Sequence, residues 1–402
     1  MVERVIFPFR GAELGGSHVA TFTLAKALRD SFQIECVVVC PQDSLIMNEA
    51  RRLGIRVIPN GEEPTGRNSA LTDFMWAQRR RRILQPEAAA GGAIVHCNDI
   101  NTLRSWGLAA RLAGMGVVYQ HHALNRLWWP PHLLSLSHAS AVSSVSDSTT
   151  AAMMNWRRDV VKELNPFEIA PNFDRLAARE AILKEFAWPS NTLVMGWIGN
   201  FWDRKRPFFF LEVAAELAKR NTRYRFVMFG RDGDHSLRDV QQRALAMGIH
   251  WATALPGFRQ PVEGNVACLD LLLAPAPREP FGRALVEAII LGTPIVATRG
   301  AGHSEIINAW GGGLLVDQDD NSQRVAQLCA EVMANPDRYR LPQKRRKEIA
   351  ASLSPESHAG RMMALYGQAA RGDSGRQNSI TGEAQRRSHG RRAWRLPPSG
   401  VK

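Results

Sequence analysis

Two glutamates that stand eight residues apart, Glu279 and Glu287, are the side chains of this chain best suited to chemistry. Residues 283–291 are apolar almost all round, which predicts a buried helix, and Glu279 lies just before it. The free N–H groups at a helix start suit an anion such as phosphate. Such an arrangement, with Phe281-Gly282 between the two glutamates, can therefore give one carboxylate to sugar hydroxyls and backbone amides to a diphosphate.

A structural interpretation fits the same spacing. Arg283 precedes Glu287 by four positions, so the two could form an ordinary ion pair on one helix face. An acidic residue such as Glu279 is also favoured near a helix N-terminus. The spacing alone leaves both interpretations open.

A second anion site is indicated by Gly15-Gly16-Ser17, which follows the first apolar run and precedes a helical stretch at 19–29. Glycine lets a ligand approach the backbone, and Ser17 is suited to be the N-cap. A plain tight turn is the alternative, because the dinucleotide pattern G-x-G-x-x-G is missing.

The elements that must position these residues come from an alternation of short apolar strands and helices. The predicted strands are 5–9, 34–39, 56–58, 93–96, 116–120 and 141–145, then 194–198, 225–229, 254–255, 271–274, 295–297 and 313–316. This alternation predicts an α/β protein with parallel sheets. We expect two Rossmann-like domains, at 1–170 and 171–353, a helix at 354–371 and a basic disordered tail at 372–402.

Size and composition agree with two domains. The chain has 402 residues, 45% of them hydrophobic, and five scattered cysteines that predict reduced thiols. We find no apolar run of the ~18–20 residues that a membrane span needs, and no signal-peptide pattern at the start. The net charge of +13 permits a nucleotide diphosphate, an acidic membrane surface or nucleic acid as a partner.

The segment 279–298 resembles the Glu-x7-Glu signature of retaining glycosyltransferases of family 4, and the resemblance extends over roughly residues 5–370. It implies the GT-B fold, in which two Rossmann-like domains face a cleft and the last helix crosses back to the N-terminal domain. It also implies that the C-terminal domain binds a nucleotide sugar and the N-terminal domain the acceptor. Glu287 would then hold ribose hydroxyls and Glu279 the transferred sugar.

Further residues are assigned through the same resemblance. Lys205 matches a lysine that holds the donor diphosphate, whereas Asn200 stands where an arginine is usual, so that Arg204 or Arg206 would substitute. Gly15 and Gly16 fall on the donor loop.

One histidine of the pair His121-His122 would contact the sugar or the acceptor, and the offset favours His122. Other positions that match are Gly230 to Gly233 near the base and ribose, Asn172 at the interdomain hinge, a glycine-rich turn with Gly300, Gly302 and Glu305, and the cleft-shaping His96, Asp99 and Ser146.

We expect neither a metal nor a cofactor. No His, Cys or Asp cluster has metal-ligand spacing. We expect front-face transfer, in which the leaving phosphate oxygen takes the acceptor proton and Glu279, His122 and Lys205 surround the reacting groups. The alternatives are a nucleotide-sugar epimerase or hydrolase of the same fold and a non-catalytic anion-binding protein. A tail with a single aromatic residue, Trp394, argues against nucleic acid.

The expected acceptor is a glycan or lipid-linked intermediate of envelope or extracellular polysaccharide. The expected location is the cytoplasm, peripheral on the inner face of its membrane. Basic patches at Arg79–Arg82 and at Arg51, Arg52 and Arg56, with the aromatic pair Trp128-Trp129, favour an anionic bilayer surface.

The tail generates a first prediction. From Arg371 to Lys402 there are eight Lys or Arg against two Asp or Glu, a net charge of about six, with little apolar surface to offset an ordering entropy of ~1–2 kcal/mol per residue. Truncation after Arg371 should leave the melting temperature and donor affinity unchanged. Thermal unfolding of both chains checks this, and a truncated chain that unfolds would show that the tail belongs to the folded body.

Overall fold

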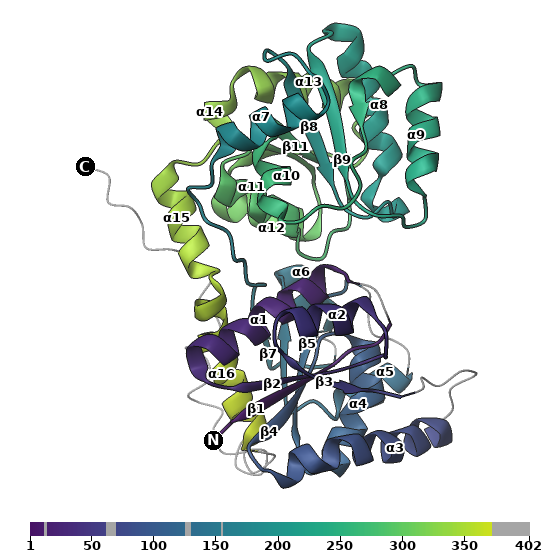
Figure 1. The fold of residues 1–402 in the computed structure, drawn as a ribbon, viewed down its shortest axis with the longest axis vertical. Coiled ribbons are helices and arrows are strands. Elements are labelled where there is room, and N and C mark those ends of the chain that lie inside the picture. Colours follow the sequence, from purple (N-terminus) through teal and green to yellow (C-terminus); the bar gives the residue numbers. More distant parts are fainter. Residues whose placement is uncertain (12–13, 62–69, 125–129, 154–155, 372–402) are drawn as a thin grey trace.

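The computed structural model describes residues 1–11, 14–61, 70–124, 130–153 and 156–371. Two α/β domains are stacked end to end, with the C-terminal domain above the N-terminal one in Figure 1. Each domain has one parallel sheet with helices on both faces, as expected from the alternation of strands and helices. Among the described residues no helix has the length and apolar character needed to cross a bilayer.

The N-terminal sheet has seven strands in the described residues, in the order β3-β2-β1-β4-β5-β6-β7 and all parallel. The strands are β1 (Arg4–Pro8), β2 (Glu35–Cys40), β3 (Arg56–Pro59), β4 (Ala93–Cys97), β5 (Gly116–His121), β6 (Ala141–Ser144) and β7 (Val160–Lys162). Valine, isoleucine and phenylalanine fill both faces of the central strands, as burial on both sides of a parallel sheet requires.

Helices cover both faces of this sheet. They are α1 (Gly16–Phe32), α2 (Leu45–Arg52), α3 (Ala70–Ala89), α4 (Ile100–Leu112), α5 (Pro130–Leu136) and α6 (Asp147–Met153). One core cluster joins the sheet to α1 and α2, and the other joins it to α3, α4 and α5.

The C-terminal sheet has six parallel strands in the described chain, in the order β10-β9-β8-β11-β12-β13. They are β8 (Leu193–Ile198), β9 (Tyr224–Phe229), β10 (Thr253–Ala254), β11 (Leu271–Ala274), β12 (Ile295–Thr298) and β13 (Gly313–Val316). The helical elements around them are α7 (Arg175–Glu185), η1 (Asp203–Lys205), α8 (Pro207–Arg220), α9 (Leu237–Ala246), η2 (His250–Ala252), α10 (Val262–Ala267), α11 (Arg283–Leu291), α12 (Ala301–Trp310), α13 (Ser322–Ala334), α14 (Pro336–Tyr339) and α15 (Gln343–Ser352).

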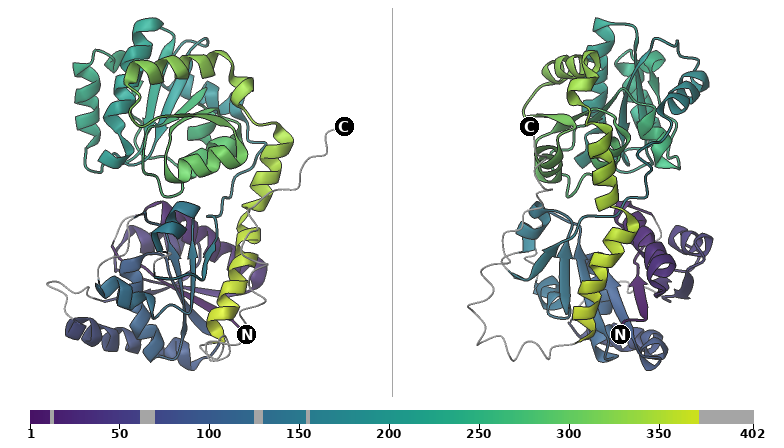
Figure 2. Two further views of the ribbon diagram at one scale, coloured as in Figure 1. Left: turned by 180° about the vertical axis from the view of Figure 1, so that it is seen from behind. Right: turned by 90° about the vertical axis from the view of Figure 1, so that its left-hand side faces the viewer.

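The last helix, α16 (Pro355–Ala370), runs from the C-terminal domain down the side of the N-terminal domain, as Figure 2 shows from two directions. It packs on α1 and β5. Tyr366, fully buried on α16, shares a hydrogen bond of 2.8 Å with Nδ1 of His96 at the end of β4. The expected return of the last helix to the N-terminal domain is confirmed.

The strand order explains where a site can lie. In each sheet the winding direction reverses, between β1 and β4 and again between β8 and β11. The loops that follow these strands leave a crevice at the carboxyl ends, which is where parallel α/β sheets bind ligands. The segments after β1, β8 and β11 contain Gly16, Lys205 and Glu279, so the topology brings together the residues singled out from the sequence.

Two local expectations were wrong or incomplete. Ser17 is not the N-cap of α1, because the helix begins at Gly16 with Gly15 in the extended N-cap position. There Gly15 N donates to Nδ1 of His18 at 2.8 Å, so a side chain of the first turn bonds back to the N-cap backbone and no N-cap side chain accepts from the helix. The edge strand β7 was not predicted, since three residues on a sheet edge carry little apolar pattern.

Candidate active site

A cavity of about 480 Å³ lies between the two domains. Gly15, Gly16 and His122 contribute to its wall from the N-terminal domain. The other predicted residues on the wall come from the C-terminal domain and are Arg204, Lys205, Glu279, Phe281, Gly282 and Glu287. The volume falls within the range of pockets that enclose a small organic ligand.

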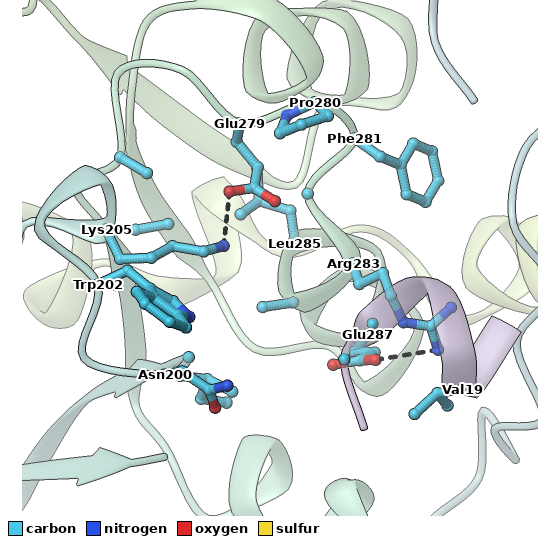
Figure 3. A pocket seen from close by; sticks show the side chains of 18 of the residues that line it. Val19, Asn200, Trp202, Lys205, Glu279, Pro280, Phe281, Arg283, Leu285 and Glu287 are labelled. Atoms are coloured by element: carbon cyan, nitrogen blue, oxygen red, sulfur yellow. Dashed lines mark hydrogen bonds and ion pairs between the residues drawn. The ribbon is translucent and has the colours of Figure 1, made fainter. Parts of the chain in front are cut away.

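An ion pair joins the segments that follow β8 and β11. Lys205 Nζ lies 2.5 Å from Glu279 Oε2 (Figure 3). An Arg204 guanidinium nitrogen lies 3.3 Å from the same oxygen. Burial acts to raise the pKa of Glu279, but the charge and hydrogen bond of Lys205, with smaller effects of His303 and Arg204, outweigh it and hold that pKa below its ordinary value. Glu279 is therefore a carboxylate at neutral pH.

The second glutamate lies in a different environment. Glu287 is 5% exposed on α11, and its nearest cation is Arg283, with nitrogen and oxygen 3.6 Å apart. Burial raises the pKa of Glu287 above its ordinary value, and the charge of Arg283 only partly opposes this. The ion pair between Arg283 and Glu287 that the i, i+4 spacing allows is therefore present, but its atoms are too far apart for a strong hydrogen bond. The carboxyl oxygens of Glu287 remain available to hydroxyl groups in the cavity.

The start of α11 provides backbone donors to the same cavity. Gly282 is its N-cap and has a φ of +98°, a conformation that favours glycine. Gly302, at the start of α12, donates from its backbone N to the Glu279 carbonyl at 2.9 Å. A Cβ atom at position 302 would lie 2.3 Å from the Phe281 carbonyl oxygen, so a side chain there would displace the loop.

The N-terminal domain approaches α11 closely. A Cβ atom on Gly16 would lie 3.3 Å from Cδ of Arg283, so the beginnings of α1 and α11 are neighbours across the domain boundary. Both helix N-termini carry partial positive charge. An anion between them would meet two sets of free N–H groups.

The two histidines at the end of β5 have separate positions. His122 is half-buried and on the cavity wall, whereas His121 is buried beneath it with Nδ1 2.6 Å from the Tyr119 hydroxyl. Burial, with smaller contributions from nearby positive groups, lowers the pKa of His122 to about 3. His122 is therefore a neutral hydrogen-bonding group at neutral pH.

Several predicted residues lie away from the cavity wall. Gly230 packs on the backbone, where a Cβ atom would lie 1.8 Å from the Gly199 carbonyl oxygen, so close strand packing explains this glycine. His96 holds α16, and Asp99 caps α4 with hydrogen bonds from the backbone N of Asn101 and Thr102. Arg206 lies over the Phe209 ring, 4.0 Å from its centroid.

Two contacts tie the domains together beside the cavity. Ser146 Oγ donates to the Pro280 carbonyl at 2.6 Å, next to Glu279. The Glu305 carboxylate on α12 accepts hydrogen bonds from Asp147 N at 2.6 Å and Ser148 N at 2.8 Å, at the start of α6. These contacts fix the loop that contains Glu279 and Pro280, together with α12, relative to the N-terminal domain.

His303 was not predicted as a site residue. It lies on the cavity wall, where a Cβ atom at Gly282 would approach its ring to 3.1 Å. Burial lowers the pKa of His303 to about 4, although Glu279 opposes this effect. The available signal was its position in the first turn of α12, three residues after Gly300, which lies in the turn that follows β12.

Asn165 was also missed. Its side chain is 3% exposed, it lies on the cavity wall, and its Oδ1 has no hydrogen-bond partner among the described residues. Nothing in the local sequence pattern marked it. Within the described chain no group of three or more His, Cys, Asp or Glu side chains is arranged to hold a metal ion.

Comparison with known proteins agrees with this geometry. Residues 178–350 match the family described as glycosyl transferases group 1. A D-inositol 3-phosphate glycosyltransferase of Corynebacterium jeikeium is 32% identical over 183 residues, 44% of this chain and 42% of that protein. A GDP-mannose-dependent alpha-(1-6)-phosphatidylinositol dimannoside mannosyltransferase of Mycobacterium tuberculosis is 27% identical over 305 residues, 71% of this chain and 74% of that protein.

The fold has solved relatives. Anabaena HepE, in a crystal structure with UDP and glucose, superimposes with a TM-score of 0.73 and 18% identity, over 90% of this chain and 98% of that one. The matched part thus spans about two-fifths of the corynebacterial protein but nearly all of the HepE chain.

Two facing parallel-sheet domains, joined by a crossing helix and enclosing a cavity at both switch points, define the GT-B fold. Within that fold, residues 178–350 of the C-terminal domain are similar to the group 1 glycosyltransferases.

The two carboxylates generate a second prediction. Glu287→Gln should keep the fold, because burial already disfavours the charged form. Under the assignment of Glu287 to ribose hydroxyls that the resemblance implies, it should weaken nucleotide-sugar binding by about tenfold. Under the matching assignment of Glu279 to the transferred sugar, Glu279→Ala should lower kcat by roughly a hundredfold, more than it changes affinity.

Steady-state kinetics with the donor that binds best measures both effects. Glu331→Gln, on an exposed part of α13, is the matched control and should behave as the native chain. Native kinetics in both site variants would show that these carboxylates do not serve the donor.

Proposed function

We propose that this chain is a retaining glycosyltransferase that moves a sugar from a nucleotide-diphosphate sugar to a glycan or lipid-linked acceptor. The observation that carries the proposal is the Lys205–Glu279 ion pair beside the start of α11, on the wall of an interdomain cavity. At this place a cationic side chain and backbone N–H groups are available to a diphosphate, and carboxylates beside them are available to hydroxyl groups. The group 1 family match supports the same chemistry.

In this proposal the donor diphosphate lies at the start of α11, with Lys205 and the amides of Phe281 and Gly282 around it. Glu287 holds the ribose hydroxyls, and Glu279 and His122 contact the transferred sugar. The bond between sugar C1 and the phosphate oxygen breaks, and a bond from C1 to the acceptor oxygen forms on the same face. The acceptor proton passes to the leaving phosphate oxygen, so no separate protein base is required.

The electrostatic part of the mechanism follows from the site charges. Negative charge grows on the leaving diphosphate, and fixed positive groups stabilise it most when water is excluded. Arg204 and Lys205 supply such charge, and the starts of α1 and α11 add backbone N–H groups. Metal-independent transfer is therefore part of the proposal.

The test is an assay of transfer to acceptor extracts, with UDP-, GDP- and ADP-sugars as donors. Three bases are needed because HepE was crystallised with UDP, whereas the mycobacterial relative is named for GDP-mannose. We expect one donor to support transfer with retained anomeric configuration, read by nuclear magnetic resonance of the product. Binding at a hundred times the dissociation constant should also add about 2.7 kcal/mol of stability.

The third prediction concerns metal ions. Transfer should survive excess EDTA, because the proposed diphosphate contacts are a lysine, an arginine and backbone amides. The rate with and without EDTA is the measurement. Loss of activity in EDTA that manganese or magnesium restores would contradict the proposed neutralisation of the diphosphate.

We further propose that the N-terminal domain docks on anionic lipid. Exposed apolar side chains lie on α3, Phe74 and Met75, and on α5, Leu134, and both helices pack on α4. The mycobacterial relative is named for a phosphatidylinositol dimannoside. The pair Trp128-Trp129 lies outside the described residues.

The arginine run on α3 is less solvated than the sequence led us to expect. Arg80 is 4% exposed, lies over the Trp76 and Trp106 rings, and donates to the Ser105 carbonyl. Arg80 is buried because α3 packs on α4 on this side. Arg79 and Arg82 remain exposed and available to lipid headgroups.

The fourth prediction follows from these residues. The chain should float with anionic vesicles and not with neutral ones at low salt, because each basic residue near an anionic surface contributes on the order of 1 kcal/mol. The double variant Arg79→Glu, Arg82→Glu should lose this binding. The matched control Arg238→Glu, Arg324→Glu, on exposed positions of the other domain, should keep it. Equal recovery with both vesicle types, or none with either, would contradict electrostatic docking.

A further inference from the structure

The described structure places three basic side chains of lysine or arginine on the cavity wall: Arg204, Lys205 and Arg283. Arg204 and Lys205 both bind the Glu279 carboxylate, at 3.3 and 2.5 Å. Two positive charges there share one negative charge. Arg283 lies on the other side of the cavity, at the start of α11. The anion beside it is Glu287 rather than Glu279.

The Arg283 guanidinium has few strong contacts for a group so enclosed. It donates one hydrogen bond, of 3.3 Å, to the Pro166 carbonyl, and it lies over the Phe167 ring with 4.4 Å to the centroid. The distance to Glu287 is 3.6 Å, beyond ordinary hydrogen-bond length. An arginine has five N–H donors, and this side chain is 20% exposed on the cavity wall, so the contacts named here use only a part of its donor capacity.

The electrostatics of this pair are incompletely balanced. Burial lowers the pKa of Arg283 from its ordinary value, with Glu287 opposing the effect, and burial raises the pKa of Glu287. Both shifts show that each ion loses more hydration than its partner replaces. A buried ion that lacks full compensation binds a counter-ion favourably.

The surroundings of Arg283 determine the sign and shape of that counter-ion. Its Cδ is the atom that a Cβ on Gly16 would approach to 3.3 Å, so the starts of α1 and α11 converge on this side chain. In Figure 3 it lies beside Val19 of α1, with Glu287 next to it. Two positive helix ends and a planar fork of N–H donors suit phosphate oxygens.

We propose that Arg283 binds the diphosphate group of the nucleotide-sugar donor, as a second cation across the cavity from Lys205. This inference rests on the proposed function and adds a residue to it. Arg283 contacts Pro166 and Phe167, which lie in the segment between β7 and α7, so its charge is in place when the two domains are together. Lys205 then contacts both Glu279 and the diphosphate, and Arg283 neutralises further phosphate oxygens from the other side of the cavity.

The experiment measures ligand affinity by isothermal titration of the full chain. The probes are UDP, GDP and ADP, with the matching nucleosides and monophosphates. Arg283→Met keeps most of the side-chain volume and removes the charge. Its affinity for the best nucleoside diphosphate should fall roughly 10- to 100-fold, the loss expected for a charged hydrogen bond, while nucleoside affinity stays the same.

Two further variants make the result specific. Arg283→Lys retains the charge without the fork and should recover part of the diphosphate affinity. Arg338→Met, an exposed arginine of the same domain, should leave every affinity unchanged. Thermal unfolding monitors the fold of each variant, and if the methionine variant does not fold, the lysine variant should still bind diphosphate more weakly with nucleoside affinity unchanged.

The outcomes separate the inference from the function on which it rests. A native chain that binds none of the three diphosphates would overturn both. Native binding with equal diphosphate affinity in the folded Arg283 variants would overturn the inference alone. A parallel loss for nucleoside and diphosphate would also overturn it, because it would show that Arg283 only supports the domain interface.

Discussion

The ion pair between Lys205 and Glu279 is the interaction on which this site depends. Glu279 lies in a loop where burial would otherwise favour a neutral acid, and the lysine keeps it ionised. The pair also joins the segments that follow β8 and β11, the two strands between which the winding of the C-terminal sheet reverses. One contact therefore fixes the charge of a carboxylate and the geometry of the crevice that contains it.

The N-terminal domain places the start of α1 against this site. Its sheet reverses between β1 and β4, and the helix after β1 starts within van der Waals reach of the start of α11. Ser146 and Glu305 hold the domains in this relation through hydrogen bonds to the Pro280 carbonyl and the start of α6. Neither domain has the complete set of donors and carboxylates, so the proposed chemistry belongs to the interface.

The sequence predicted those features that depend on neighbouring residues. The apolar run at 283–291 predicted the buried helix α11. The position of Lys205 directly after a strand predicted that it lies at the carboxyl end of the C-terminal sheet, beside the crevice. It could not predict contacts between distant segments. Arg283 against Gly16, His303 against Gly282 and the orphan Oδ1 of Asn165 follow from how the domains meet. Gly230 lies outside the cavity wall, and its place near the nucleotide stays a prediction, because glycine for strand packing and glycine for ligand approach look alike in a sequence.

The most direct test of the central claim is a crystal structure of the full chain with the nucleoside diphosphate that binds best. The account predicts phosphate oxygens within hydrogen-bond distance of Lys205 Nζ and of the amide nitrogens of Phe281 and Gly282, with ribose hydroxyls on the Glu287 carboxyl group. A nucleotide bound with its phosphates outside the interdomain cavity, and with the Lys205–Glu279 pair facing only solvent, would contradict it.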